Sequence, residues 1–297
     1  MVLRLAVAAL LSCLALAGCA SKPSSSLSAA RTAYGPGADA ETVGQGAPNG
    51  TSLALLKPPF SGFGRTEPRA GAGGLAGRTL RVASISDIRL NDKEVILTFD
   101  DGPMPGKTDR VLDVLSRHGV KATFLMVGQM AAAYPAIATR VADHGHSIGS
   151  HTYNHANLVA AGPTRALADI ESGNAVVAKA AHQPVGFFRF PYLADTGALR
   201  HAVTDQGLVI LDVDIDTKDY FKLTPETIAA NTMARVRSKR KGIILMHDIH
   251  ARTAAMLPLL LARLKAEGYK VVALEHRRSR MPLLVSATTS DTGARRM

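Results

Sequence analysis

The sequence predicts an α/β fold, a distorted (β/α) barrel of about seven parallel strands in a single domain. Between Leu80 and Glu275, short apolar runs alternate with helix-like segments, which is the order that a parallel sheet requires. The apolar runs are largely continuous, as in strands that are buried on both faces. This stretch of about two hundred residues is enough for one sizeable core, and seven or eight strands permit closure into a barrel.

The predicted strands are the apolar runs at residues 95–99, 122–127, 147–150, 185–188, 208–213, 243–246 and 271–273. The predicted helices lie between them, at residues 107–117, 136–142, 164–181, 197–204, 225–237 and 254–267. Thr224 and Pro225 form a strong helix start, since a hydroxyl caps the first turn and proline suits the first helical position. Functional side chains of such barrels sit at the carboxyl ends of the strands. Polar clusters that directly follow the predicted strands are therefore the candidates for a site.

The amino terminus has the pattern of a bacterial secretory signal, with Arg4 before an apolar stretch from Leu5 to Ala17. This stretch is too short to span a bilayer permanently. It ends in Leu16-Ala17-Gly18-Cys19, which resembles the lipobox of bacterial lipoproteins, where the cysteine becomes the lipid-modified first residue. We therefore expect residues 1–18 to be removed and Cys19 to anchor an exported protein to a membrane of the cell envelope, on the periplasmic face in a Gram-negative cell. The alternative is an ordinary signal peptide followed by a chance cysteine.

Composition divides the rest of the chain into three parts. Residues 19–79 are rich in Ser, Gly, Ala and Pro, and we expect them to form a flexible tether. The folded domain is expected at residues 80–285, followed by a disordered tail at 286–297. Cys13 lies in the expected signal, so any metal site of the mature chain would use histidine and carboxylate ligands.

The chain is strongly basic. Its formal net charge is +11, which becomes +10 when residues 1–18 are removed together with Arg4. Export argues against nucleic acid as a partner, whereas anionic envelope polymers or lipid headgroups would attract such a protein. The densest basic run, residues 235–241, lies at a predicted helix end, where positive charge suits the helix dipole. We interpret it as a solvated helix end rather than a polyanion site.

The first polar cluster is Thr98-Phe99-Asp100-Asp101-Gly102-Pro103, at the end of a predicted strand. Successive strand residues point to opposite faces, but the Gly-Pro turn breaks this alternation and can bring both carboxylates to one rim. A cation between Asp100 and Asp101 would remove their repulsion. A turn in which the carboxylates cap backbone amides explains the pair equally well at this point.

The second cluster, residues 149–155, holds His151 and His155. At spacing i, i+4 the two histidines would share one face of a helical turn and could bind one metal ion, although a lone pair often has only surface or capping roles. Asp101 would complete a set of two histidines and one carboxylate with an open position for water or substrate. The His-Glu-x-x-His pattern of zinc peptidases is absent, because Thr152 stands in place of the glutamate.

Three further clusters follow apolar runs: Arg189-Phe190-Pro191-Tyr192, Asp216-Thr217-Lys218-Asp219-Tyr220 and Leu245-Met246-His247-Asp248. In this order and spacing, the five clusters resemble the motifs of the polysaccharide deacetylases, also called the NodB homology domain or carbohydrate esterase family 4. The resemblance covers roughly Lys93 to Glu275.

The resemblance implies a role for each matching residue. Asp100 would be the catalytic base, oriented by Arg189, and His247 the catalytic acid, paired with Asp219. The expected metal ligands are Asp101, His151 and His155. The substrate and oxyanion residues would be Pro191, Tyr192 with its backbone amide, Leu245 against the acetyl methyl, and Tyr220, which replaces the family's usual tryptophan.

Zinc is the default ion for such ligands, with cobalt, nickel and manganese as alternatives. Of the other histidines, we interpret His146 as structural and rank His250 second to His247 for the acid role, because it falls beyond the strand end.

The resemblance implies a hydrolase that removes N-acetyl groups from amino sugars of a polysaccharide such as peptidoglycan or poly-N-acetylglucosamine. One alternative is an O-acetyl esterase that acts on an acetylated polysaccharide such as xylan. Another is an inactive polysaccharide-binding lipoprotein, which would be expected to have lost some of the five motif residues that bind metal or transfer protons. No protein partner can be inferred.

Overall fold

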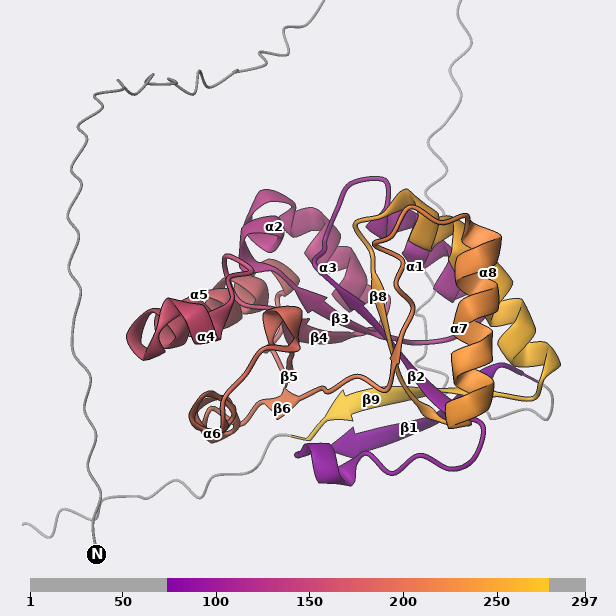
Figure 1. Ribbon diagram of the computed structural model, residues 1–297. Helices are drawn as coiled ribbons and strands as arrows, with labels where there is room; N and C mark the ends of the chain where they lie inside the picture. The colour runs from indigo at the N-terminus through magenta and orange to yellow at the C-terminus, as the bar shows by residue number, and fades with distance from the viewer. Residues whose placement is uncertain (1–73, 278–297) are drawn as a thin grey trace, which may run out of the picture. The chain divides into compact units, whose positions relative to one another are not determined.

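Seven parallel strands form the nearly closed barrel that the sequence predicts. The computed structural model describes residues 74–277 (Figure 1). The barrel strands are β2 (Glu94–Asp100), β3 (Thr123–Met126), β4 (Ser147–Ser150), β5 (Phe187–Phe188), β6 (Val209–Ile210), β7 (Ile215–Asp216) and β8 (Gly242–His247). Their order is β6-β5-β4-β3-β2-β8-β7, and all the pairings are parallel. Among the described residues, no ladder joins β6 to β7, which leaves the barrel open there.

Two more strands lie outside this circle. β1 (Ala76–Val82) pairs with β9 (Lys270–His276), which itself pairs with only the first two residues of β2 (Figure 1). Val272 and Leu274 of β9 pack against the barrel interior, and the hydroxyl of Ser147, at the start of β4, donates to the Leu274 carbonyl. β9 therefore closes the amino end of the barrel and leaves the carboxyl end for chemistry.

The predicted start of the domain needs correction. The boundary between residues 79 and 80 falls inside β1, and Leu75 is already buried in the core. The apolar pattern does not predict β1, because exposed polar residues such as Arg78 and Thr79 interrupt it. Cys19, the expected signal peptide, the expected tether up to residue 73, the end of the predicted domain at residues 278–285 and the expected tail at 286–297 lie outside the described residues. Within residues 74–277, no helix is long and apolar enough to cross a membrane.

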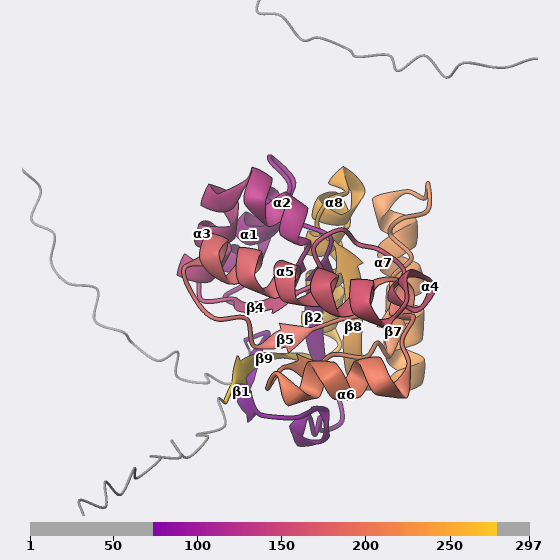
Figure 2. The same ribbon diagram turned by 90° about the vertical axis from the view of Figure 1, so that its left-hand side faces the viewer.

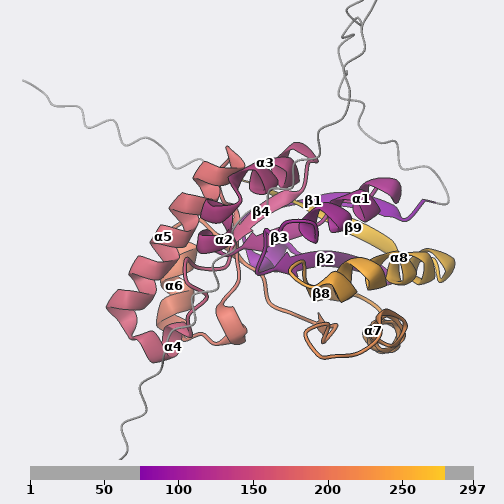
Figure 3. The ribbon, with the colours of Figure 1, turned by 90° about the horizontal axis from the view of Figure 1, so that it is seen from above.

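Helices cover the outside of the barrel (Figures 2 and 3). They are α1 (Thr108–Arg117), α2 (Gly128–Ala133), α3 (Pro135–Asp143), α4 (Leu158–Ala161), α5 (Pro163–Ala181), α6 (Gly197–Asp205), α7 (Pro225–Lys239) and α8 (Ala251–Ala266). Two short 3-10 helices, η1 (Ile85–Asp87) and η2 (Pro191–Leu193), complete the described elements. Thr224 caps α7 by accepting from the Thr227 amide, and Pro225 is its first residue, as predicted.

The alternation of side chains along β2 separates two environments. Val95, Leu97 and Phe99 pack in the core that the strands share with the outer helices. Ile96 faces the barrel interior with apolar side chains from other strands. Thr98 and Asp100 have the same parity as Ile96, so the barrel interior changes from apolar to polar toward its carboxyl end.

The basic run at residues 235–241 lies at the end of α7, and much of its charge is paired. Arg237 pairs with Glu267, and Arg240 pairs with Asp92. The ammonium group of Lys241 donates to the Leu90 carbonyl. These contacts agree with the interpretation as a solvated helix end.

Candidate metal centre and active site

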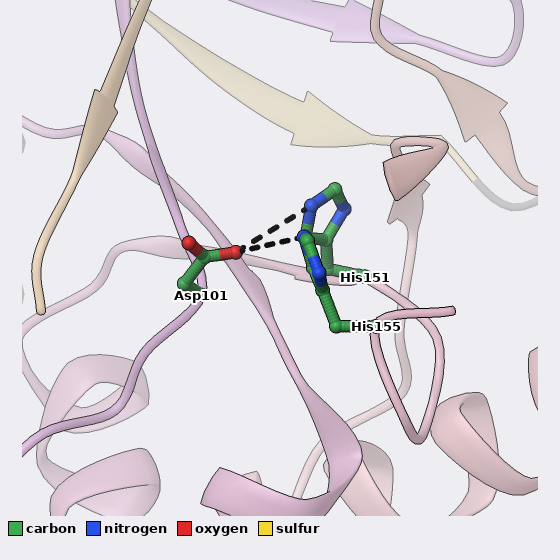
Figure 4. A group of neighbouring side chains, drawn as sticks. All are labelled: Asp101, His151 and His155. Carbon is green, nitrogen blue, oxygen red and sulfur yellow. Dashed lines mark ion pairs between the residues drawn. The ribbon is translucent and has the colours of Figure 1, made fainter. Parts of the chain in front are cut away.

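Asp101 leaves β2 with a backbone φ of 76°, which breaks the alternation of the strand. Its Oδ1 atom lies 3.3 Å from Nε2 of His155 and 3.6 Å from Nε2 of His151 (Figure 4). The predicted two-histidine, one-carboxylate set is therefore brought together, with three potential ligand atoms within 4.8 Å of one another.

Gly102 allows the chain to turn directly after Asp101. A Cβ atom at this position would lie 2.2 Å from Oδ2 of Asp248, so any larger residue would collide with that carboxylate. The hydroxyl of Thr108, at the start of α1, donates to the same Oδ2 at 2.6 Å and accepts from the Met104 amide at 2.7 Å. These contacts fix the loop that follows the two aspartates.

The two histidines do not share a helical turn, which corrects the prediction from their spacing. Residues 151–157 form a loop, in which Thr152 and His155 have left-handed backbone angles, with φ of 65° and 55°. This loop turns the two imidazoles toward each other, with ring centroids 4.9 Å apart. The spacing of four residues identified the correct pair, but a loop rather than a helix brings the rings together.

A hydrogen bond sets the tautomer of His151. Its Nδ1 lies 2.8 Å from the carbonyl oxygen of Arg189, which can only accept, so Nδ1 carries the proton and Nε2 keeps a free lone pair. Burial lowers the pKa of His151, although Asp100 and Asp101 act in the opposite direction. The side chain is thus a neutral imidazole, the form that binds metal.

Asp101 supplies the evidence that this set fits a cation. Its Oδ1 is buried and has no hydrogen-bond partner within the described part of the chain. An unsatisfied buried acceptor costs about 1–3 kcal/mol, and more when it is charged. A divalent ion between Oδ1 and the two Nε2 atoms would satisfy it, and two nitrogens with one carboxylate oxygen suit zinc.

Asp100 has different partners from Asp101. It is only 2 % exposed, and its Oδ1 accepts from Nη1 of Arg189 at 2.7 Å. The Arg189 guanidinium is itself fixed, because it also donates to the Thr98 hydroxyl and to the Leu211 carbonyl. Oδ2 of Asp100 lies 3.8 Å from Nε2 of His151. Asp100 is thus next to the metal set but is held by an arginine.

His247, at the end of β8, has a carboxylate partner. Its Nδ1 donates to Oδ1 of Asp219 at 2.7 Å, while its backbone amide and the Thr253 hydroxyl both donate to Oδ2. Burial disfavours the charged imidazolium, but the hydrogen bond and the charge of Asp219 outweigh it and raise the pKa of His247 to about 9. His247 therefore holds a proton at neutral pH.

His250 has no such partner among the described residues. It borders the same pocket, and its ring centroid lies 6.0 Å from that of His247. Burial lowers the pKa of His250, so it is neutral where His247 is charged. This difference supports His247 over His250 as the proton donor.

These groups surround one cavity of about 450 Å³ at the carboxyl end of the barrel. Tyr192 and Tyr220 stand at its rim, 66 % and 43 % exposed, and Leu245 contributes an apolar wall. The Tyr192 ring packs edge-on against His155, and the Tyr220 hydroxyl donates to Asp216 at 2.9 Å. Pro191 is buried beside Tyr192 and does not line the cavity.

Comparison with known proteins agrees with this geometry. A family model described as polysaccharide deacetylase matches residues 87–211. A peptidoglycan-N-acetylglucosamine deacetylase of Bacillus cereus is 34 % identical over 209 residues, which cover 66 % of this chain and 75 % of that protein. The chain belongs to the polysaccharide deacetylase family.

Other polysaccharide deacetylases are similar to different extents. The peptidoglycan-N-acetylglucosamine deacetylase PgdA of Listeria monocytogenes is 32 % identical over 198 residues, which cover 66 % of this chain and only 41 % of that protein. A chitin deacetylase of Colletotrichum lindemuthianum is 34 % identical over 196 residues, covering 61 % of this chain and 77 % of that protein. The solved structure of a Bdellovibrio bacteriovorus peptidoglycan deacetylase has a TM-score of 0.63 at 29 % identity, and the match covers 70 % of this chain and 61 % of that one.

Several residues of this site were not predicted from the sequence. Phe190, Leu193 and Asp216 line the cavity, and Thr98 and Thr253 fix Arg189 and Asp219. Phe190 and Asp216 stand within recognised clusters, so their position after a strand was a usable signal. Thr253 lies in the first turn of α8, and nothing in its local sequence distinguishes it from an ordinary helix residue.

Proposed function

We propose that this chain is a metal-dependent hydrolase that removes N-acetyl groups from the N-acetylglucosamine residues of peptidoglycan. One observation carries the proposal: the candidate metal ligands share a single cavity with an arginine-bound carboxylate and with a histidine that is paired with a carboxylate. Hydrolysis of an amide needs a base for the attacking water and an acid for the departing amine. Asp100 and His247 match these two roles.

A divalent ion held by Asp101, His151 and His155 would supply Lewis acidity toward the acetamide carbonyl and make water a stronger nucleophile. Asp100 accepts the proton of the attacking water at Oδ2, while Arg189 holds Oδ1. The backbone amide of Tyr192 donates to the oxygen that becomes negative. The carbon-nitrogen bond then breaks, and His247 gives its proton to the sugar nitrogen, so that acetate and a free amine are released.

The identity of the polymer rests on the named relatives. Those from Bacillus cereus and Listeria monocytogenes are named peptidoglycan-N-acetylglucosamine deacetylases, whereas that from Colletotrichum lindemuthianum is named a chitin deacetylase. A bacterial export signal favours the cell-wall polymer. The intact set of Asp100, Asp101, His151, His155 and His247 supports an enzyme over an inactive binding protein.

We also propose that the mature protein begins at Cys19 and that a lipid on this residue holds the domain at a membrane of the cell envelope. The motif Leu16-Ala17-Gly18-Cys19 after an apolar stretch supports this location. Mass spectrometry of the protein purified from membranes is expected to show an acylated cysteine at the amino terminus. An unmodified terminus elsewhere would exclude the anchor.

The substrate can be tested with three acetylated polymers. Acetate release is measured from peptidoglycan, from N-acetylglucosamine oligomers and from acetylated xylan, each with and without a chelator. We expect chelator-sensitive release that is fastest from peptidoglycan. Release from xylan alone would indicate an O-acetyl esterase, and no release from any polymer would indicate a binding protein.

A further inference from the structure

The loop that carries His151 and His155 has a backbone conformation that is unfavourable on its own. Thr152 and His155 both have left-handed angles, at φ of 65° and 55°. Residues other than glycine rarely adopt this region, and it is least favourable for a β-branched residue such as Thr152. Such residues persist only where the surrounding structure holds them. The contacts of this loop therefore decide whether the two imidazoles face Asp101.

Asp169, on α5, makes the most concentrated set of these contacts. Its Oδ1 accepts from the Tyr153 amide at 3.2 Å, from the Asn154 amide at 2.9 Å and from Nδ2 of Asn154 at 3.0 Å. Both residues lie between the two histidines in the sequence. Within the described residues, all the side-chain hydrogen bonds of Asp169 go to this loop.

The loop is also bound by residues at the start of α2. The amides of Gly128 and Gln129 donate to the carbonyls of Thr152 and Tyr153 at 2.9 and 3.1 Å. The side-chain amide of Gln129 donates to Oδ1 of Asn154 at 2.8 Å. The loop is thus held by α2 through its carbonyl groups and by α5 through its amide groups.

Gly173 allows α5 to lie in direct contact with the loop that carries His151 and His155. A Cβ atom on Gly173 would lie 2.4 Å from the backbone carbon of Thr152, which no real side chain tolerates. Gly173 stands one helical turn after Asp169, so the two residues present the same face of α5 to the loop.

The buried position of the Asp169 carboxylate does not by itself favour the stability of the fold. The residue is 8 % exposed, and its Oδ2 is buried without a hydrogen-bond partner among the described residues. A buried carboxylate with one unsatisfied oxygen is unfavourable for stability. The three hydrogen bonds to the loop therefore indicate a role for Asp169 other than stabilising α5.

We propose that Asp169 is a positioning residue for the metal centre, which holds the 151–155 loop so that His151 and His155 face Asp101 before metal binds. This inference rests on the metal site of the proposed function. It adds a residue that contacts neither metal nor substrate and acts through the amides of Tyr153 and Asn154. Loss of such outer partners typically weakens metal binding about 10- to 100-fold.

Metal affinity provides the test, with Co²⁺ as the probe because its absorption spectrum reports the ligand set. Titration of the metal-free protein is expected to show about 10- to 100-fold weaker binding for Asp169→Ala. Asp169→Asn keeps an oxygen acceptor toward the loop and is expected to restore most of the affinity. Glu171→Ala, which removes an exposed carboxylate from the same helix, is the matched control and is expected to bind Co²⁺ like the native protein.

Asn154→Ala keeps the test decisive where Asp169→Ala fails to fold. Asn154 is exposed, and its removal breaks the side-chain bonds to Asp169 and Gln129 while the backbone contacts stay. We expect weaker Co²⁺ binding with an unchanged melting temperature of the metal-free protein.

Native affinity in a folded Asp169→Ala variant, or in Asn154→Ala where the first does not fold, would overturn the proposal. So would a native protein that binds no Co²⁺. The Co²⁺ titration does not depend on acetate release. Weaker Co²⁺ binding by the variants would therefore support the role of Asp169 even if the protein released no acetate.

Discussion

Asp100 and Asp101 are neighbours in the sequence, yet their carboxylates have different partners in the fold. The sequence predicted a turn that brings both to one rim, and it left open whether a cation or backbone capping explains them. Among residues 74–277, Oδ1 of Asp101 has no hydrogen-bond partner and lies beside two imidazoles, which favours the cation, whereas Arg189 holds Asp100. The arginine lies 89 residues further along the chain. Local sequence patterns could not predict this contact, and only the family resemblance predicted it.

Replacement of Asp100 by asparagine separates proton transfer from metal binding. The amide cannot take a proton from water, so we expect kcat to fall by roughly 10²- to 10⁴-fold. Metal affinity is expected to stay near the native value, because Asp101, His151 and His155 are unchanged. Steady-state kinetics and a metal titration on one protein sample check both statements. Native kcat in Asp100→Asn would remove Asp100 from the base role.

The pairing of His247 with Asp219 predicts a pH dependence. The acid form of His247 is present below its raised pKa of about 9 and is lost as the pH rises through that value. Asp219→Asn removes the charge that raises the pKa and leaves burial, which lowers it. The alkaline limb of kcat/KM is therefore expected to move toward neutral pH. An alkaline limb that does not move in Asp219→Asn would show that His247 is not the group that titrates.

At the scale of elements, the sequence predicted the long, strongly apolar strands and the helices between them. It missed β7, where Asp214 and Asp216 flank the single apolar residue Ile215, and β1, which exposed polar side chains interrupt. It also placed His151 and His155 on a helical turn, because a spacing of four residues is the usual sign of one. Left-handed angles at Thr152 and His155 depend on contacts with α2 and α5, which the local sequence does not reveal.

Truncation tests the part that β1 plays. A chain that begins at Gly74 keeps the whole strand, whereas one that begins at Leu80 loses the buried Leu75 and the pair between Arg78 and Glu94. Burial of a leucine side chain contributes about 1.5–3 kcal/mol, so we expect the shorter chain to lose at least about 1.5 kcal/mol of unfolding free energy. Urea denaturation of both chains measures this difference. Equal stability would show that β1 is dispensable.

In the whole molecule, apolar packing and the candidate site lie at opposite ends of the barrel interior. β9 and β1 close its amino end over apolar side chains, and the carboxyl end gathers polar groups from the ends of β2, β4 and β8 and from the loops after β5 and β7. The order of strands and helices predicted this arrangement, because parallel strands bring their carboxyl ends to one side. The shape of the substrate groove was not predicted, since it depends on the loops that carry Tyr192 and Tyr220.

In the proposed function, one metal ion, bound by Asp101, His151 and His155, is required for acetate release from peptidoglycan. The most direct measurement is acetate release by metal-free protein as Zn²⁺ is added in known amounts. We expect no release without metal and a linear rise that ends at one ion per chain. Full activity in the metal-free protein, or a rise that continues well beyond one ion per chain, would contradict it.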